Sequence, residues 1–132
     1  MIDRDFSNYR IVIIDDDSAY CKLLSTLIKK YFNVQSEIFI NPKLGLKHIQ
    51  KQPPDLLVLD LEIPSLDGFT FMKILRSNPE LKDLPVIIST GISTKELIIN
   101  LAKLNITDYI LKNIDTSVIL KKIYSILETI EK

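Results

Sequence analysis

Five short apolar runs, rich in valine, isoleucine and leucine, alternate along the chain with segments of helical length. The runs cover residues 10–14, 35–40, 55–59, 86–89 and 108–111. Because they show no regular polar alternation, they are typical of strands that are buried on both faces of a sheet. A repeated strand–helix unit predicts an α/β fold built on one parallel sheet.

Each helical segment begins with a residue that suits the first turn of a helix. We expect Ser18 to cap the first helix, and its apolar stripe to consist of Leu23, Leu24, Leu27, Ile28 and Tyr31. The corresponding signals for the later helices are Asn41-Pro42, Asp67-Gly68, Ser93 with Glu96, and one of Asp115, Thr116 and Ser117.

The fourth helical segment carries more apolar residues than one narrow stripe needs. They are Ile98, Ile99, Leu101 and Leu104. Two interpretations stay open: a wide buried face, or an exposed apolar patch for dimerisation or partner docking.

The length of 132 residues predicts one domain, with residues 1–8 as a short, loosely held extension and residues 9–132 as the domain itself. Lys plus Arg and Asp plus Glu both number 17, so the formal net charge is zero. This excludes the basic footprint of a nucleic-acid-binding domain, and we expect no direct binding of nucleic acid.

Neither the apolar runs nor the start of the chain indicates a membrane or an export signal. No run approaches the length that spans a bilayer, and the first residues are charged and polar. A single cysteine, Cys21, cannot form an internal disulfide and suits a reducing compartment. We therefore expect a cytoplasmic protein without a membrane partner.

Reactive side chains follow four of the apolar runs directly. Asp15 and Asp16 follow the first run, Asp60 the third, Thr90 the fourth and Lys112 the fifth. In a parallel sheet these side chains would emerge at one edge, which is where open α/β sheets place their sites. Three carboxylates, a hydroxyl and an ammonium group together indicate a divalent metal and a phosphoryl group.

Asp60 is the most informative of these residues. It ends a run so apolar that its carboxylate must lie in a desolvated position, where its charge is costly unless a metal or a lysine lies beside it. A carboxylate can also act as a nucleophile toward phosphorus and form an aspartyl-phosphate. Lys112 would then neutralise charge on the phosphoryl group, and the Thr90 hydroxyl would bond one of its oxygens.

The motifs at the strand ends resemble, in order and spacing, the receiver domain of two-component response regulators. They are IVIIDDD at residues 11–17, PDLLVLDLEIP at 54–64, DG at 67–68, PVIISTG at 85–91 and DYILK at 108–112. The resemblance covers roughly residues 9 to 131. It implies a flavodoxin-like, doubly wound three-layer sandwich with five parallel strands in the order 2-1-3-4-5.

The resemblance also implies a chemistry for the strand-end residues. Asp60 would accept a phosphoryl group from the phosphohistidine of a sensor histidine kinase or a phosphotransfer protein. Asp15, Asp16, Asp60 and the backbone carbonyl of Glu62 would hold Mg²⁺, for which Mn²⁺ could substitute. Lys112 would pair with the phosphoryl group. Because such a site catalyses its own phosphorylation and dephosphorylation, we class the protein as a signalling phosphoacceptor rather than an enzyme.

A conformational switch is the second implication of the resemblance. Thr90 and Tyr109 would form the switch pair, in which the hydroxyl moves toward the phosphoryl group and the ring turns inward behind it. The added charge of about −1.5 to −2 would bias the surface formed by the fourth helix, the fifth strand and the fifth helix. A downstream effector or a second copy of the chain would bind there.

The chain departs from the usual receiver pattern at several positions. Asn113 follows Lys112 where the family usually has proline, and we predict a trans peptide there because a non-proline cis bond costs roughly 2.5–4 kcal/mol. Leu104-Asn105 replaces a usual Gly-Ala, Ile63 a common methionine, and Glu62 adds an acid near the site. Our hypothesis for Ile92 is that it shields the phosphoryl group from water and lengthens its lifetime.

Two other functions stay open. The Asp15-x-Asp17 pair also resembles the start of a haloacid-dehalogenase-type phosphatase, in which Asp15 would be the nucleophile and Asp17 the general acid and base. Two features argue against this phosphatase hypothesis. The chain lacks an evident cap domain, and it has no clear pair of acidic residues late in the sequence that would bind the metal. Alternatively, the chain is a receiver-like interaction module that is not phosphorylated. The phosphatase and receiver hypotheses predict different nucleophiles: Asp15 for the phosphatase and Asp60 for the receiver.

Overall fold

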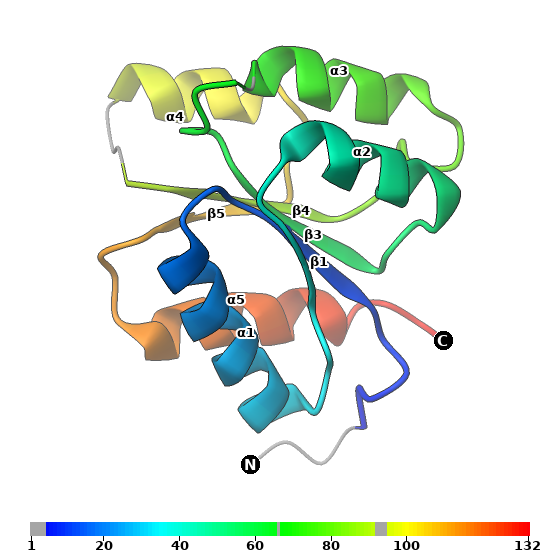
Figure 1. Ribbon diagram of the computed structural model, residues 1–132, viewed down its shortest axis with the longest axis vertical. Coiled ribbons are helices and arrows are strands. Elements are labelled where there is room, and N and C mark those ends of the chain that lie inside the picture. Colours follow the sequence, from blue (N-terminus) through cyan, green and yellow to red (C-terminus); the bar gives the residue numbers. More distant parts are fainter. Residues whose placement is uncertain (1–4, 66, 92–94) are drawn as a thin grey trace.

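Five parallel strands form a central sheet with helices on both faces, in a computed structural model that describes residues 5–65, 67–91 and 95–132 (Figure 1). The strand order is β2-β1-β3-β4-β5, as predicted. The elements in chain order are β1 (Ile11–Ile14), α1 (Ser18–Phe32), β2 (Glu37–Phe39), α2 (Pro42–Lys51), β3 (Leu56–Asp60), α3 (Gly68–Ser77), β4 (Val86–Thr90), α4 (Lys95–Ala102), β5 (Asp108–Leu111) and α5 (Thr116–Leu127).

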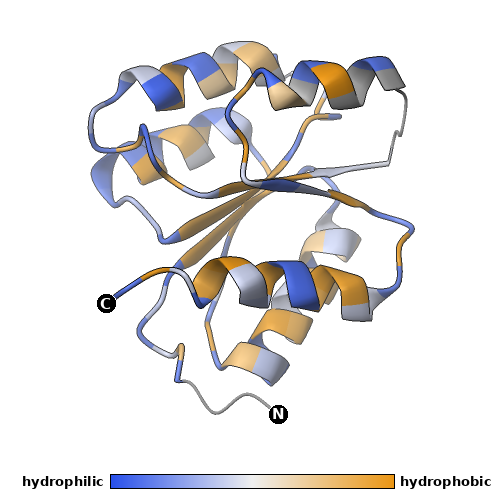
Figure 2. Ribbon diagram, turned by 180° about the vertical axis from the view of Figure 1, so that it is seen from behind, coloured by the Kyte–Doolittle hydropathy of each residue, from blue (hydrophilic) through white to orange (hydrophobic). Residues whose placement is uncertain are grey.

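The helices cover the sheet in two layers. In Figure 1, α2, α3 and α4 lie on one face, and α1 and α5 lie on the other. Alternate residues of each central strand enter the two cores: Ile11 and Ile13 face α1 and α5, whereas Val12 and Ile14 face α2 and α3. This is why the central strands are apolar up to their polar carboxyl ends, and Figure 2 shows them as a hydrophobic band between amphipathic helices.

The edge strand β2 does not follow that rule. It is shorter than predicted, and Ile38 in its middle is 40% exposed. The expectation of burial on both faces was therefore wrong for this strand. The reason is its position at the end of the sheet order, where only β1 pairs with it.

Helix caps agree with the sequence at three of the four starts that can be compared. Asn41, Asp67 and Asp115 are the N-caps of α2, α3 and α5. The cap of α1 is Asp17 and not Ser18, because the Asp17 backbone is extended and its carboxylate accepts the Tyr20 N–H at 3.1 Å. The predicted capping box at Ser93 lies outside the described residues.

The buried face of α1 is rotated relative to the predicted stripe. Cys21, Leu24, Ile28 and Phe32 are buried, whereas Leu23 is 50% exposed and Tyr31 38%. Burial in an apolar environment raises the pKa of the Cys21 thiol to about 11, so the thiol stays protonated and has a packing role.

The segment before β1 packs more tightly than the sequence indicates. Phe6 is fully buried, and its ring meets those of Tyr9, Phe32 and Tyr124 edge-on at centroid distances of 5.2, 6.0 and 5.9 Å. The expectation that residues 1–8 are loosely held was wrong for Phe6. It therefore belongs to the core beneath α1 and α5.

Candidate functional site

The register of the sheet brings the predicted strand-end residues together. Ile14 pairs with Leu59, so the next residues along β1 and β3 are Asp15 and Asp60. Asp60 in turn pairs with Ser89, and Thr90 pairs with Leu111. The carboxylates, Thr90 and Lys112 consequently lie at one edge of the sheet, as the sequence predicts.

Three carboxylates form a cluster at this edge. One oxygen from each of Asp15, Asp16 and Asp60 lies within 4.8 Å of the other two. Asp15 and Asp60 are buried, with 1% and 2% exposure, while Asp16 is exposed. The cluster is therefore buried at Asp15 and Asp60 and reaches solvent at Asp16.

Backbone amides hold the two buried carboxylates in matching orientations. Asp15 Oδ1 accepts the N–H of Asp17, and Asp60 Oδ1 accepts the N–H of Glu62, both at 2.9 Å. Each is a local turn in which an aspartate bonds the backbone two residues on. Both Oδ2 atoms are thereby left to face the lysine.

Lys112 is the cation of the site. Its Nζ lies 2.8 Å from Asp15 Oδ2 and 3.3 Å from Asp60 Oδ2, and its side chain is only 17% exposed. The Lys112 N–H also donates to the Thr90 carbonyl at 2.9 Å, which continues the β4–β5 pairing past Leu111. The peptide between Lys112 and Asn113 is trans, as predicted.

The contact between Lys112 and Asp15 is an ion pair without hydrogen-bond geometry. Asp15 Oδ2 is buried and has no hydrogen-bond partner among the described residues, in spite of the short distance to Lys112 Nζ. That 2.8 Å contact is therefore an electrostatic one. A buried carboxylate oxygen in this condition still has lone pairs that a cation could use.

The electrostatics of the site follow from burial and charge. Burial raises the pKa of Asp60 to about 6; the Asp15 charge adds to this, while the Glu62 N–H and Lys112 oppose it. Burial alone would lower the pKa of Lys112, but its contacts with Asp15 and Asp60 outweigh burial and raise that pKa. The lysine is thus charged at neutral pH, and the site carries an excess of negative charge.

The remaining predicted residues lie on β4 and β5 and directly after β3. Thr90 is buried at the end of β4, Tyr109 is half-buried on β5, and Glu62 is exposed. The Tyr109 ring lies 5.1 Å from Lys122 Nζ, which also donates to the Tyr109 carbonyl at 2.9 Å. Ile92, for which the sequence predicts a shielding role, lies outside the described residues.

Of the apolar residues expected on the fourth helix, the structure describes two side chains. Ile99 is 50% exposed, whereas Leu104, which follows the end of α4, packs against the core under α2 and α3. Ile98 and Leu101 have side chains outside the described set. An exposed apolar residue on α4 is therefore present, and the extent of a patch stays a prediction.

Sequence reasoning missed two residues of the site. The Tyr20 ring centroid lies 4.8 Å from Lys112 Nζ, and the Tyr20 hydroxyl accepts a hydrogen bond from Ser89 Oγ at 3.2 Å. The one available signal is Ser89, a polar residue that follows the apolar residues 86–88 of β4. Tyr20 carries no comparable signal, because an aromatic in the first turn of an amphipathic helix is ordinary.

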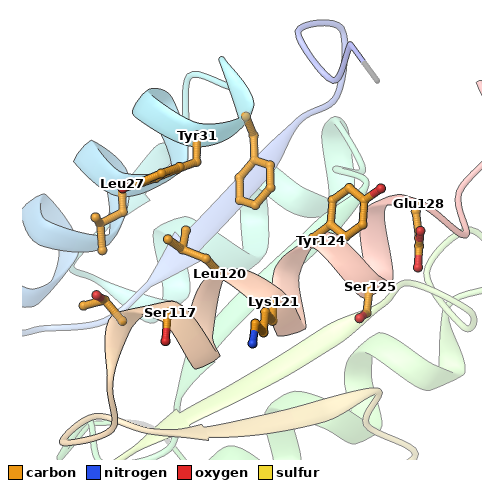
Figure 3. Close-up of a pocket in the computed structure, with 10 residues that line it drawn as sticks. Leu27, Tyr31, Ser117, Leu120, Lys121, Tyr124, Ser125 and Glu128 are labelled. Carbon is orange, nitrogen blue, oxygen red and sulfur yellow. The ribbon is translucent and has the colours of Figure 1, made fainter. Parts of the chain in front are cut away.

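A groove of about 640 Å³ lies between α1 and α5, away from the acidic cluster (Figure 3). Figure 3 shows side chains from both helices that line it, among them Leu27, Tyr31, Leu120 and Tyr124. A smaller hollow of about 160 Å³, bounded by Tyr20, shares Leu27 with this groove. The groove is mainly apolar and lacks a carboxylate cluster, so we assign the candidate site to the acidic edge.

Comparison with known proteins agrees with this geometry. Residues 11–124 match the response regulator receiver domain family, and the chain belongs to that family. It is similar to the chemotaxis protein CheY-3 of Vibrio cholerae, at 27% identity over 92% of this chain and 93% of the relative. It is also similar to the 3',5'-cyclic-nucleotide phosphodiesterase regA of Dictyostelium discoideum, at 29% identity, but spans only 16% of that relative's length.

Solved structures show the same fold. The signal receiver domain of a DNA-binding response regulator from Colwellia psychrerythraea has a TM-score of 0.85 at 24% identity, covering 92% of this chain and 99% of that one. A two-component response regulator from Clostridium difficile has a TM-score of 0.84 at 22% identity, covering 95% and 100%. The chain is thus a receiver domain of flavodoxin-like fold, a class of signalling domain.

The position of Asp17 bears on the phosphatase alternative. The Asp17 carboxylate caps α1, an arrangement that does not favour its use as the general acid of a phosphatase.

Among the described residues, no helix has the length and apolarity that crossing a bilayer requires.

Proposed function

We propose that this receiver domain is phosphorylated on Asp60 in a Mg²⁺-dependent reaction, with the phosphohistidine of a sensor histidine kinase or phosphotransfer protein as donor. The observation that carries the proposal is the juxtaposition of Asp60 with two other carboxylates and with Lys112 Nζ at 3.3 Å. This set provides a nucleophile, cation ligands and a compensating ammonium group at one point.

In the transfer step, an oxygen of the Asp60 carboxylate forms a bond to phosphorus as the P–N bond to the donor imidazole breaks. The bonding electrons go to the imidazole nitrogen, which then takes a proton, and an aspartyl-phosphate remains. The Glu62 N–H on Asp60 Oδ1 fixes the plane of the attacking carboxylate. As negative charge moves from the carboxylate to the phosphoryl oxygens, the ammonium group of Lys112 would remain close to it and stabilise it.

The residues present fit a hard divalent cation. Asp15, Asp16 and Asp60 offer carboxylate oxygens within 4.8 Å of one another, and Asp15 Oδ2 lacks a hydrogen bond. Such oxygen ligands suit Mg²⁺, and Mn²⁺ prefers the same type. We propose the Glu62 carbonyl as a further ligand. When bound, the cation would neutralise the carboxylates and polarise the phosphoryl oxygens.

The proposed output is a change at the surface made by α4, β5 and α5. Thr90 and Tyr109 would be the switch pair, the first at the end of β4 and the second half-buried on β5. The exposed Ile99 on α4 supports an effector or a second copy of the chain as partner. We propose residues 9–132 as the signalling unit, acting in the cytoplasm without direct nucleic-acid binding.

Locating the phosphoryl group tests the proposal. The purified chain is incubated with acetyl phosphate and Mg²⁺, and peptide mass spectrometry identifies the labelled residue. We expect one phosphoryl group, on Asp60. A label on Asp15 would instead support the phosphatase reading, and a chain that takes no label with either Mg²⁺ or Mn²⁺ would support the interaction module that is not phosphorylated.

Replacing Asp15 with asparagine should weaken Mg²⁺ binding by about tenfold or more, because it removes one of the charges that attract the cation. Isothermal titration calorimetry measures the affinity. Asp17→Asn is the matched control: it removes a charge of the same sign next to the site, and asparagine caps helices about as well as aspartate. Equal losses in both variants would contradict a specific role for Asp15.

A further inference from the structure

We infer that Tyr20 positions Lys112 for the phosphorylation reaction. The inference rests on the proposed function, since it concerns how the ammonium group of that site is held. The Tyr20 ring centroid lies 4.8 Å from Lys112 Nζ. This is within the range in which an aromatic face attracts a cation.

Lys112 needs such a constraint because its ammonium group ends a flexible four-carbon chain. The carboxylates of Asp15 and Asp60 pull Nζ toward the acidic edge, at 2.8 and 3.3 Å. The Tyr20 ring supplies a contact from α1 in addition to these. Together these contacts leave the lysine side chain only 17% exposed.

An aromatic ring has an advantage over another acid in this position. A third carboxylate beside Nζ would compete with the phosphoryl group for the positive charge. The face of a neutral ring attracts the ammonium group without neutralising it. Tyr20 can therefore restrict where Nζ lies while Lys112 keeps its full charge for the incoming phosphoryl oxygens.

The tyrosine is itself held at both ends. Its backbone N–H donates to the Asp17 carboxylate that caps α1, at 3.1 Å. Its hydroxyl accepts a hydrogen bond from Ser89 Oγ at 3.2 Å, and Ser89 is fully buried on β4. The ring thus connects the start of α1 to the end of β4, directly before Thr90.

The test compares rates of labelling by acetyl phosphate in a double-mutant cycle. Tyr20→Leu, which removes the ring, should slow labelling by about tenfold, whereas Tyr20→Phe, which keeps it, should stay within about threefold of the parent. Tyr31→Leu is the matched control: it makes the same change on α1, at a half-exposed position in the groove facing α5. We expect it to label at the parent rate.

The second side of the cycle separates positioning from a general structural effect. In a Lys112→Ala background, Tyr20→Leu should change the labelling rate by less than about twofold, because the group it positions is gone. The same slowing with and without Lys112, or no slowing in either, would overturn the inference. If Lys112→Ala takes no measurable label, the same four proteins are compared by urea unfolding, where zero coupling between Tyr20 and Lys112 would overturn it.

Failure of this inference and failure of the proposed function give different results. If Asp60 is not the phosphoacceptor, the parent chain itself shows it, with no label or with a label elsewhere. If only the inference is wrong, the parent is labelled on Asp60 and the Tyr20→Leu variant behaves like Tyr31→Leu. The urea cycle measures the contact between Tyr20 and Lys112 in either case.

Discussion

Replacing Asp60 with asparagine should abolish phosphorylation and, without divalent cations, make the folded protein more stable. The loss of labelling follows because asparagine has no carboxylate to attack phosphorus. The gain in stability follows from burial: the Asp60 side chain is about 2% exposed, and its charge lies close to that of Asp15. We expect the free energy of unfolding at pH 7.5 to rise by about 1–3 kcal/mol.

The pH dependence of this gain has a definite sign. Burial raises the pKa of Asp60 in the folded chain from the ordinary 3.8 to about 6. Well below pH 3.8 the group is protonated in both folded and unfolded chains, so it causes no difference between them. Between about pH 4 and 6 the unfolded chain has ionised this group while the folded chain still holds its proton, so the parent progressively loses stability that the variant keeps, and the loss is complete once the pH has passed about 6.

Urea unfolding of parent and Asp60→Asn between pH 4 and 8 in EDTA measures this difference. It should grow from near zero at pH 4 and become constant above about pH 7. Asp83→Asn, at an exposed position, is the control for removing one acid, and its free energy of unfolding should stay close to that of the parent. Saturating Mg²⁺ should narrow the gap, because the cation stabilises the parent's cluster by mass action. An asparagine variant less stable than the parent at pH 7.5 would contradict the burial argument.

The strand ends of this chain could be predicted because their pattern is local. An apolar run followed by aspartate, threonine or lysine marks the end of a buried parallel strand, and parallel strands end at one edge. The positions of Asp15, Asp60 and Lys112 follow from that reasoning alone. The 2.8 and 3.3 Å distances to Lys112 Nζ do not, because they depend on the side-chain turns that orient both carboxylates.

What the sequence did not reveal depends on contacts between distant segments. The Tyr20–Ser89 hydrogen bond joins α1 to β4; Tyr20 looks ordinary within its helix, and the polar Ser89 does not by itself identify its partner. The α1 stripe was misjudged for a related reason: Leu23 fits the helical period but lines the small hollow beside Tyr20 and not the core. Periodicity indicates that a helix has an apolar face, while packing decides which residues complete it.

Phe6 is the largest error of this kind and gives the second strong prediction. It stands among polar residues, Asp5, Ser7 and Asn8, so no pattern marks it as a core residue. Its ring nevertheless has no exposed surface and meets three other aromatic rings edge-on. Truncating a buried phenylalanine leaves a cavity in addition to the lost transfer energy, so Phe6→Ala should lower the free energy of unfolding by about 3–5 kcal/mol.

Urea unfolding monitored by circular dichroism measures the effect, and Phe69→Ala is the matched control. Phe69 lies in the first turn of α3 and is 41% exposed, so the same truncation there should cost less than about 1 kcal/mol. Phe6→Leu, which keeps much of the apolar volume, should fall between the parent and the alanine variant. Because Phe6 lies beneath α1 and α5 and not at the acidic edge, Phe6→Ala should still be labelled on Asp60 under conditions where it is folded. A loss no larger than that of Phe69→Ala would show that residues 5–8 are an appendage and not part of the core.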